Sequence, residues 1–326
     1  MSGAAEDTVL VGDIGGTHAR FAVVNMSTSP WQIDHRSDIE ATASTFAPSL
    51  RSYLDQAGLA ALPPAIALAV AGPVHDGQVV LTNRGWRIAE GDLREMGFHQ
   101  ALLINDFVAL AFSVATLGPH DFRTIGPDVA GLAGEPISVL GAGTGFGVSC
   151  LARFHGRAVP IATEGGHAGF APGNAQEVAV LGILARRFGY VSIERILSGP
   201  GMENLYGALA ELGGRRPASL SAPDIVARRA DDPDCRDAVD MFCGIYGAVA
   251  GDFALSYGAR GGVYVAGGIA LKIEAILEAS AFRARFESKG RFSDYVKAIP
   301  TRLILSEDTA FLGAANASRE FRDVTV

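Results

Sequence analysis

The sequence predicts a two-lobed α/β protein, on the basis of its length, its apolar runs and two glycine-rich turns. Its 326 residues exceed the roughly 250–300 at which a single hydrophobic core stops growing, so two lobes are expected. Short β-branched and aromatic runs alternate with longer helical patterns, which is typical of α/β folds. Two segments, each made of a strand, a glycine-rich turn and a second strand, lie roughly 130 residues apart. They suggest a duplicated architecture.

The first lobe opens with three expected strands that form an antiparallel meander, Thr8–Val11, Phe21–Val24 and Gln32–Ile39. The expected elements that follow are a helix at about Ser44–Gln56, strands at Ala65–Val70, Val79–Leu81 and Ala101–Ile104, and a helix at about Phe107–Leu117.

A loop rich in glycine and proline, Gly118–Pro136, marks the boundary between the lobes. The expected strands of the second lobe are Ile137–Leu140, Gly147–Arg153, Ala158–Ile161, Gly262–Ala266 and Arg302–Leu305, and its expected helices are Gln176–Phe188, Gly201–Leu212, Ala222–Arg229 and Cys235–Tyr257. We expect a last helix, Thr309–Arg319, to pack on the first lobe. The lobes then comprise residues 1–117 with 306–326, and residues 118–305.

Composition excludes several classes of function. The formal net charge is −8 and no Lys/Arg-rich run occurs, which argues against a nucleic-acid partner. The three cysteines, Cys150, Cys235 and Cys243, form no C-x-x-C pair, which indicates a reducing compartment and no structural metal. The N-terminus lacks a signal-peptide pattern, and no uninterrupted apolar stretch approaches the roughly 18 residues that span a bilayer. We therefore expect a cytoplasmic protein with no membrane partner.

The first candidate site is the turn of the opening hairpin, Gly12-Asp13-Ile14-Gly15-Gly16-Thr17-His18-Ala19-Arg20. Gly15 and Gly16 let backbone N–H groups approach an anion, and Thr17 adds a hydroxyl donor. Asp13, at a strand end, can hold Mg²⁺ through water. A plain glycine-rich hairpin turn explains the same residues. A Walker A lysine and a Rossmann register are both missing from this segment.

The second candidate is the segment Leu140-Gly141-Ala142-Gly143-Thr144-Gly145-Phe146-Gly147. A dinucleotide-binding register fails here, because Phe146 stands where the third glycine should fall and a strand follows instead of a helix. Four glycines around one threonine between two strands instead favour a second phosphate-binding turn, with a tight structural turn as the alternative.

Polar residues in three other places are candidates for binding a sugar or for catalysis. Asn105-Asp106 follows an apolar strand, where α/β sheets present catalytic groups, although either residue can simply cap the next helix. In Glu164-Gly165-Gly166-His167, a carboxylate and an imidazole can bind neighbouring sugar hydroxyls; a solvated loop histidine or a zinc ligand are the alternatives. Glu194 either joins them or forms an ion pair with Arg195 or another base.

Taken in order, these segments resemble the bacterial glucokinase family, in the group without a zinc-binding cysteine cluster, within the hexokinase and actin-like ATPase superfamily. The resemblance runs from Gly12 to the C-terminal helix. The segments that carry it are Gly12–Arg20, Ile104–Phe107, Gly141–Gly147, Glu164–His167, Leu197–Gly201 and Ala266–Ile269. It implies the actin-like ATPase (ribonuclease H-like) fold, with an active-site cleft between a smaller and a larger lobe.

The resemblance also implies roles for individual residues. The glucose-binding positions are Asn105, Asp106, Glu164, His167 and Glu194, with Asp106 as the catalytic base and Asn83 nearby. The positions for ATP are Gly12, Asp13, Gly15, Gly16, Thr17, Gly143, Thr144, Gly145, Gly267 and Gly268, the last two toward adenosine. His18 departs from the family pattern, in which asparagine is common, so its role stays open.

The implied reaction is ATP-dependent phosphorylation of glucose to glucose 6-phosphate, which feeds glycolysis, with ATP and Mg²⁺ as cofactors and a homodimer as the expected assembly. In-line phosphoryl transfer depends mainly on positioning and charge stabilisation. Two other functions stay open: a kinase for another hexose or amino sugar, and a non-catalytic sugar sensor or actin-like nucleotide switch. The sensor needs no base at the sugar, so the intact Asn105-Asp106 pair argues against it. Polyphosphate as the donor also stays open.

Overall fold

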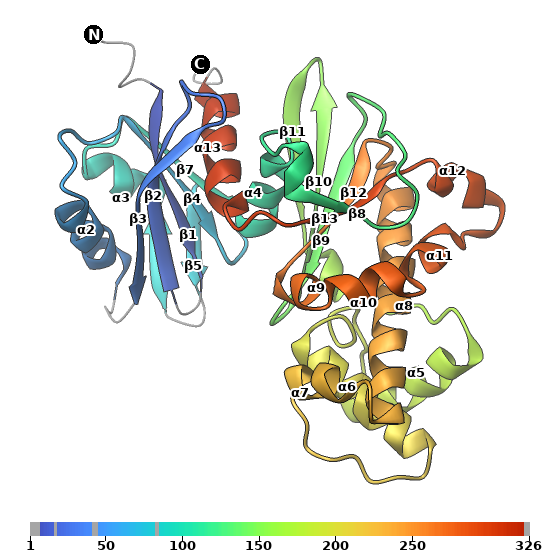
Figure 1. The fold of residues 1–326 in the computed structure, drawn as a ribbon. Helices are drawn as coiled ribbons and strands as arrows, with labels where there is room; N and C mark the ends of the chain where they lie inside the picture. The colour runs from blue at the N-terminus through green and yellow to red at the C-terminus, as the bar shows by residue number, and fades with distance from the viewer. Residues whose placement is uncertain (1–6, 16–17, 41–44, 82–84, 323–326) are drawn as a thin grey trace. The chain divides into compact units, whose positions relative to one another are not determined.

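The computed structural model describes residues 7–15, 18–40, 45–81 and 85–322, and its helices and strands are drawn in Figure 1. The chain divides into two compact units. Unit 1 contains residues 1–118 and 306–326, and unit 2 contains residues 119–305. These dividing points fall within one residue of those expected from the sequence.

Unit 1 is built on a five-stranded sheet in the order β3-β2-β1-β4-β7. Its elements are β1 (Thr8–Ile14), β2 (His18–Asn25), β3 (Gln32–Glu40), α2 (Phe46–Ala57), β4 (Ala65–Val70), β5 (Gln78–Leu81), β6 (Trp86–Ala89), α3 (Glu90–Glu95), β7 (Gln100–Asn105), α4 (Asp106–Ser113) and α13 (Thr309–Phe321). The predicted antiparallel meander of β1, β2 and β3 is confirmed, while β1, β4 and β7 are parallel. Every residue of β4 is buried, as expected for a central strand that is covered on both faces.

Alternation along β1 explains why helices cover both faces of this sheet. Leu10 packs on one face in a cluster with Phe46 of α2. Val9 and Val11 point to the opposite face, where they pack with Phe311 of α13. Successive side chains of a strand point to opposite faces, so β1 serves two apolar layers at once.

The last helix, α13, packs on α4 as the sequence analysis expects. The two helices approach closely at Gly313, where a Cβ atom would lie 1.8 Å from the carbonyl oxygen of Ala109. The Asn316 side chain donates a hydrogen bond to the carbonyl oxygen of Phe112 at 2.9 Å. These contacts explain why the C-terminal helix belongs to unit 1 although it follows unit 2 in the chain.

Unit 2 is built on a six-stranded sheet in the order β11-β10-β9-β12-β13-β8. Its elements are η1 (Pro119–Asp121), β8 (Phe122–Thr124), β9 (Ile137–Ala142), β10 (Phe146–Phe154), β11 (Arg157–Thr163), η2 (Gly165–His167), α5 (Ala175–Phe188), α6 (Gly199–Leu212), α7 (Ala222–Arg228), α8 (Pro233–Tyr257), β12 (Gly262–Ala266), α9 (Gly268–Lys272), α10 (Glu274–Ala279), α11 (Phe282–Glu287), η3 (Gly290–Phe292), α12 (Ser293–Lys297) and β13 (Thr301–Ile304).

The two sheets share one topology. In unit 2, β9, β10 and β11 form an antiparallel meander like that of β1, β2 and β3. β12 and β13 then extend in parallel from β9, as β4 and β7 extend from β1, and β8 adds an antiparallel edge strand. The duplicated architecture that the two hairpins suggested is therefore confirmed at the level of strand order.

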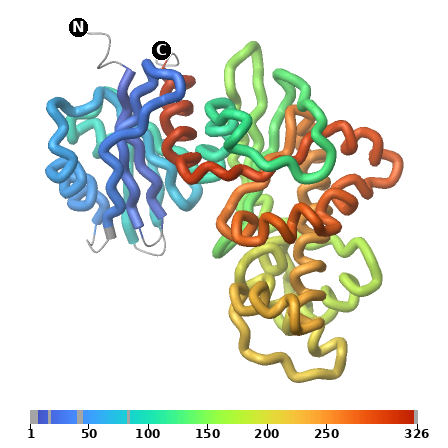
Figure 2. The backbone as a smooth tube through the Cα atoms, in the orientation of Figure 1, coloured from blue at the N-terminus to red at the C-terminus, as the bar shows by residue number. Residues whose placement is uncertain are grey.

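Helix α8 runs through the core of unit 2, and Figure 2 traces it as an orange tube from the sheet to the level of α5, α6 and α7. The Asp232 side chain caps its start by accepting the N–H groups of Asp234 and Cys235, and Gly258 ends it with a left-handed φ of 60°. By length and composition this helix could cross a membrane, which the sequence analysis did not expect of any segment. However, 67% of its apolar window is buried inside the structure, as in a core helix.

All three cysteines are free and buried in unit 2. Burial raises the pKa of the Cys150 and Cys235 thiols to about 11, and that of Cys243 to about 12. The thiolate is the reactive form of cysteine, so all three side chains should be chemically inert near neutral pH.

We expect the folded protein to resist alkylation by iodoacetamide at pH 8. A thiol pKa of about 11 leaves roughly 0.1% thiolate at that pH, against roughly 10% at the ordinary value of 9.0, so labelling should be at least about 100-fold slower. Because the pKa values are raised, reactivity should still increase above pH 9. Mass spectrometry should find three labels after unfolding in urea, whereas rapid labelling of the folded chain would contradict the burial.

Candidate active site

In unit 1, the first candidate segment is a turn between β1 and β2, of which Gly16 and Thr17 lie outside the described residues. The Gly15 N–H donates to the carbonyl oxygen of His18 at 3.0 Å. Gly12 is not part of this turn, since it lies inside β1, where a Cβ atom would be 2.6 Å from Cδ2 of Leu68. Packing within the sheet therefore explains the glycine at position 12, which the sequence analysis had placed among the phosphate-binding residues.

Asp13 pairs with Arg20 across the hairpin, a partner that the sequence analysis did not identify. Nε of Arg20 donates to Oδ2 of Asp13 at 3.1 Å, and Nη2 contacts the same oxygen. The two residues face each other in the antiparallel register of β1 and β2. The Asp13 side chain is 21% exposed, so the carboxylate is partly open to solvent.

The carboxylate of Asp13 fits a Mg²⁺ ion that is bound together with a phosphate ligand. Mg²⁺ is commonly held by one or two carboxylates, with water and substrate phosphates as the remaining ligands. Among the described residues, no group of three or more His, Cys, Asp or Glu side chains is placed to hold a metal ion by itself. One partly exposed carboxylate beside a glycine turn matches the first arrangement.

His18, whose role the sequence left open, lies on β2 and faces β3. Its Nδ1 atom is 2.9 Å from Oδ1 of Asp38. Both side chains are more than half exposed, at 55% and 56%. An ordinary surface hydrogen bond therefore accounts for His18 in this structure.

Asn105 and Asp106 lie where β7 ends and α4 begins. Asn105 is the N-cap residue: its Oδ1 accepts the N–H groups of Phe107 and Val108, at 2.9 and 3.4 Å. Its Nδ2 atom donates to the carbonyl oxygen of Gly72 at 3.3 Å, which ties the loop after β4 to the end of β7. Asp106 is the first residue of the helix, and its Oδ1 also accepts the Phe107 N–H, at 2.9 Å.

The predicted residues of unit 1 therefore gather at one edge of its sheet. Ile14 at the end of β1 is in register with Val70 of β4, which is in register with Asn105 of β7. Asp13, Asn105 and Asp106 thus lie at the carboxyl ends of neighbouring parallel strands, where ligands of α/β sheets usually bind.

In unit 2, the second candidate segment forms a tight turn between β9 and β10, which we call the glycine turn (Gly143–Gly145). The Gly143 N–H donates to the carbonyl oxygen of Gly145 at 2.8 Å, and the Gly143 carbonyl oxygen accepts the N–H of Gly199 at 2.9 Å. Thr144 at its tip is exposed, and a Cβ atom on Gly143 would meet nothing within 4 Å. The outer side of this turn is thus open to a ligand.

Glu194 binds the backbone directly after the glycine turn. Its Oε2 atom accepts the Phe146 N–H at 2.9 Å, and a Cβ atom on Gly145 would lie 2.4 Å from the same oxygen. The suggested ion pair with Arg195 is wrong, since the guanidinium of Arg195 lies over the Phe188 ring, 4.4 Å from its centroid. The Glu194 side chain is therefore in place beside the turn.

The Glu164–His167 segment is a short 3₁₀ turn with a tightly packed backbone and exposed side chains at its two ends. A Cβ atom on Gly166 would lie 2.0 Å from the carbonyl oxygen of Phe146, and the Gly166 carbonyl accepts the Glu194 N–H at 2.9 Å. The hydroxyl of Tyr190, which the sequence analysis missed, donates to the carbonyl oxygen of His167 at 2.8 Å. The Glu164 and His167 side chains are exposed.

A second pair of glycines, Gly267 and Gly268 (the glycine pair), lies beside the glycine turn at the end of β12. Gly267 has a φ of 90°, and a Cβ atom there would lie 2.5 Å from the carbonyl oxygen of Ala142. A residue with a side chain would therefore be both strained and obstructed at position 267. A Cβ atom on Gly268 would meet nothing within 4 Å, so the backbone there is open to a ligand.

Unit 2 thus brings together three segments that are far apart in sequence. Glu194 links the glycine turn to the Glu164–His167 segment, and Gly267 packs against the residue that precedes the turn. Asn83, the remaining predicted position near a sugar, lies outside the described residues.

Comparison with known proteins shows the family of the chain. The glucokinase family model matches residues 10–321. A glucokinase from a Caulobacter species is 47% identical over 311 residues, and one from Caulobacter vibrioides is 48% identical over 315 residues; each alignment covers 94% of both chains.

Solved structures show the same fold. The crystal structure of a glucokinase from an Antarctic psychrotroph has a TM-score of 0.88 at 34% identity, and the match covers 95% of this chain and 98% of that one. A ROK family glucokinase from Streptomyces griseus, in complex with glucose and AMPPNP, has a TM-score of 0.63 at 18% identity over 96% and 99% of the two chains. The predicted actin-like ATPase fold is confirmed. With a family match along nearly its whole length, the chain belongs to the glucokinase family.

Proposed function

We propose that this protein is an ATP:D-glucose 6-phosphotransferase, which transfers the γ-phosphoryl group of ATP to the 6-hydroxyl of glucose. The observation that carries the proposal is the Asn105-Asp106 pair at the carboxyl end of β7, in a chain of the glucokinase family. The closely similar relatives are named glucokinases, and the Streptomyces griseus neighbour contains glucose and AMPPNP, which supports both substrates.

In this proposal, unit 1 supplies the base and the metal ligand. Asp106 accepts the proton of the glucose 6-hydroxyl as the oxygen attacks the γ-phosphorus, and Asn105 binds a neighbouring hydroxyl. Mg²⁺, when bound, neutralises charge on the β- and γ-phosphates. Asp13 would hold this ion, while the Gly16 N–H group and the Thr17 hydroxyl bind phosphate oxygens. The N–H group of Gly15 is already donated to the His18 carbonyl oxygen within the hairpin turn.

Unit 2 supplies the remaining contacts. The glycine turn binds phosphate through the N–H groups of Thr144 and Gly145 and through the Thr144 hydroxyl, since the Gly143 N–H is donated within the turn. The glycine pair lets adenosine lie against the backbone. Glu164, His167 and Glu194 bind sugar hydroxyls. Such contacts stabilise charge without any rearrangement during the reaction, which is the main source of catalysis in phosphoryl transfer.

We further propose a cytoplasmic location and a homodimeric assembly. The buried, inert cysteines suit a reducing compartment, and the net charge of −8 does not favour binding to nucleic acid or to anionic lipid surfaces.

The proposed function predicts a marked preference for glucose among sugars. With ATP and Mg²⁺, kcat/KM for glucose should exceed that for fructose or N-acetylglucosamine by at least about tenfold, because polar groups that bind sugar hydroxyls reject ligands that leave them unpaired. ADP release across a small sugar panel measures this ratio. Equal or better use of another sugar would contradict the assignment, and no ADP release with any sugar would favour a sensor. A parallel assay with polyphosphate tests the donor.

A further inference from the structure

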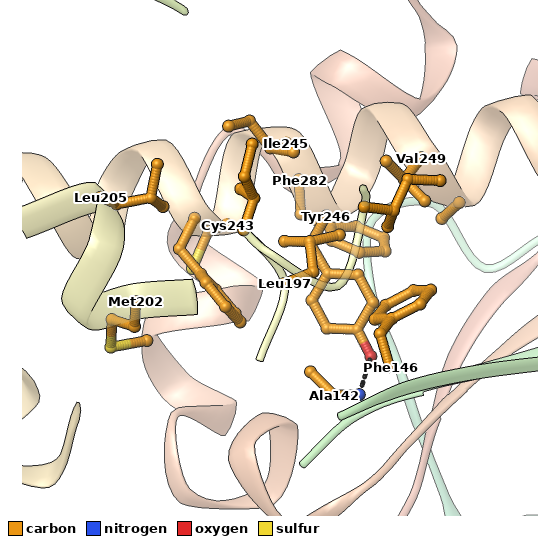
Figure 3. Packing of buried hydrophobic residues seen from close by; sticks show 14 of the residues in the cluster. Ala142, Phe146, Leu197, Met202, Leu205, Cys243, Ile245, Tyr246, Val249 and Phe282 are labelled. Carbon is orange, nitrogen blue, oxygen red and sulfur yellow. Dashed lines mark hydrogen bonds between the residues drawn. The ribbon is translucent and has the colours of Figure 1, made fainter. Parts of the chain in front are cut away.

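Tyr246, on α8, lies at the point where the glycine turn and the glycine pair meet (Figure 3). Its side chain is fully buried. The hydroxyl accepts the N–H of Ala142 at 3.2 Å and donates to the carbonyl oxygen of Ala266 at 3.4 Å. Burial raises the pKa of this phenol, so the hydroxyl keeps the proton that it donates.

The two backbone partners of Tyr246 lie at the ends of two neighbouring strands. Ala142 is the last residue of β9, directly before the glycine turn, and Ala266 is the last residue of β12, directly before the glycine pair. The strands are parallel neighbours, with Ala266 in register with Gly141. One hydroxyl therefore joins the two points at which these strands leave the sheet.

The ring of Tyr246 also contacts the far side of the glycine turn. Its centroid lies 5.8 Å from that of Phe146, the first residue of β10, in an edge-to-face arrangement with an interplanar angle of 71°. Phe242 and Phe282 hold the ring by similar edge contacts at 5.9 and 5.7 Å. Figure 3 shows the ring directed from α8 toward Ala142 and Phe146. Tyr246 thus contacts the residues on both sides of the turn from a rigid helix.

We propose that Tyr246 is a positioning residue for ATP: its hydroxyl fixes the glycine turn against the glycine pair, so that phosphate and adenosine contacts are held in register. The inference rests on the proposed function, because it assigns these two segments to one nucleotide. Tyr246 does not touch ATP, since it is buried beneath the backbone that does. Two segments that bind different parts of one ligand must keep their relative positions for both sets of contacts to form together.

Tyr246→Phe removes the hydroxyl and keeps the packed ring. We expect the KM for ATP, and the Kd for AMPPNP measured by calorimetry, to rise about fivefold to tenfold, while the KM for glucose stays within twofold. If the hydrogen bond were merely structural, its loss would lower Tm and leave the ratio of the KM for ATP to the KM for glucose unchanged. Phe146→Leu, which removes the edge contact from the turn, should raise the KM for ATP in the same direction by about threefold.

Tyr206→Phe is the matched control. Tyr206 is also buried in unit 2, and its hydroxyl accepts a backbone N–H, that of Ala218 at 3.4 Å, which belongs to neither glycine segment. Both KM values should be unchanged in this variant. An unchanged KM for ATP in folded Tyr246→Phe overturns the inference while glucose phosphorylation by the parent stands. If Tyr246→Phe does not fold, an unchanged value in Phe146→Leu overturns it instead. A parent that neither binds AMPPNP nor releases ADP overturns the proposed function and this inference with it.

Discussion

Replacing Asp106 with asparagine is expected to lower kcat for glucose phosphorylation by about 10²–10⁴-fold, the usual cost of losing a general base. Asparagine has nearly the same shape as aspartate but cannot accept the proton of the 6-hydroxyl. Because the loss falls on the chemical step, binding of AMPPNP and glucose by calorimetry should remain close to that of the parent.

The structure separates this catalytic role from helix capping. Asn105 is the N-cap of α4 and accepts two backbone N–H groups, whereas Asp106 accepts the Phe107 N–H from the first position of the helix. The asparagine side-chain oxygen can still accept that N–H. The remaining loss is the charge–dipole interaction at the helix start, typically about 0.3–1 kcal/mol, so Tm should fall by only a few degrees.

Asp92→Asn is a matched control for this experiment. Asp92 is an exposed carboxylate on α3 of the same unit, paired with Arg87. Its replacement should leave kcat unchanged. Near-normal kcat in a folded Asp106→Asn variant would remove Asp106 as the base and leave it as part of the helix start alone.

The longer elements of the fold were predictable because their patterns are local. The β-branched and aromatic runs of β1 and β2, the apolar run of β4 and the periodic sequence of α8 each identify an element without knowledge of its neighbours. The elements that were missed are short: β6 and β8 have four and three residues, α3 and α9 to α12 have five or six each, and the 3₁₀ helices η1, η2 and η3 have three each. Such helices complete fewer than two turns, so an amphipathic period cannot be recognised in them.

The site was predictable only as separate segments. Glycine turns and polar residues at strand ends are visible in the sequence, and the family resemblance supplied their roles. What the sequence did not show are contacts between distant residues: Tyr246 with Ala142 across 104 positions, and Glu194 with Phe146 across 48. Neither side chain belongs to a sequence motif from which its contact partner can be predicted. The Asp13–Arg20 pair could have been predicted, because the register of the hairpin places these two positions opposite each other.

The second large effect is expected at Glu164 and His167, whose side chains are exposed while their backbone is held in place. Glu164→Ala and His167→Ala should each raise the KM for glucose by about 10–100-fold, which corresponds to about 1.4–2.8 kcal/mol, the range for a polar group that loses its hydrogen-bond partner. The KM for ATP should change by less than threefold, since neither side chain is assigned to the nucleotide.

The melting temperature shows whether a loss of glucose affinity comes from a disturbed fold. The carbonyl oxygen of His167 accepts the Tyr190 hydroxyl, and the segment is further fixed by the Gly166 carbonyl; both contacts use the backbone, so alanine side chains leave them intact. Tm should therefore stay near the parent value while glucose affinity falls. Glu278→Ala, an exposed carboxylate on α10, is the control and should change neither quantity. If the KM for glucose is unchanged in both variants, Glu164 and His167 are solvated loop residues, and the recognition of glucose must be sought elsewhere in the chain.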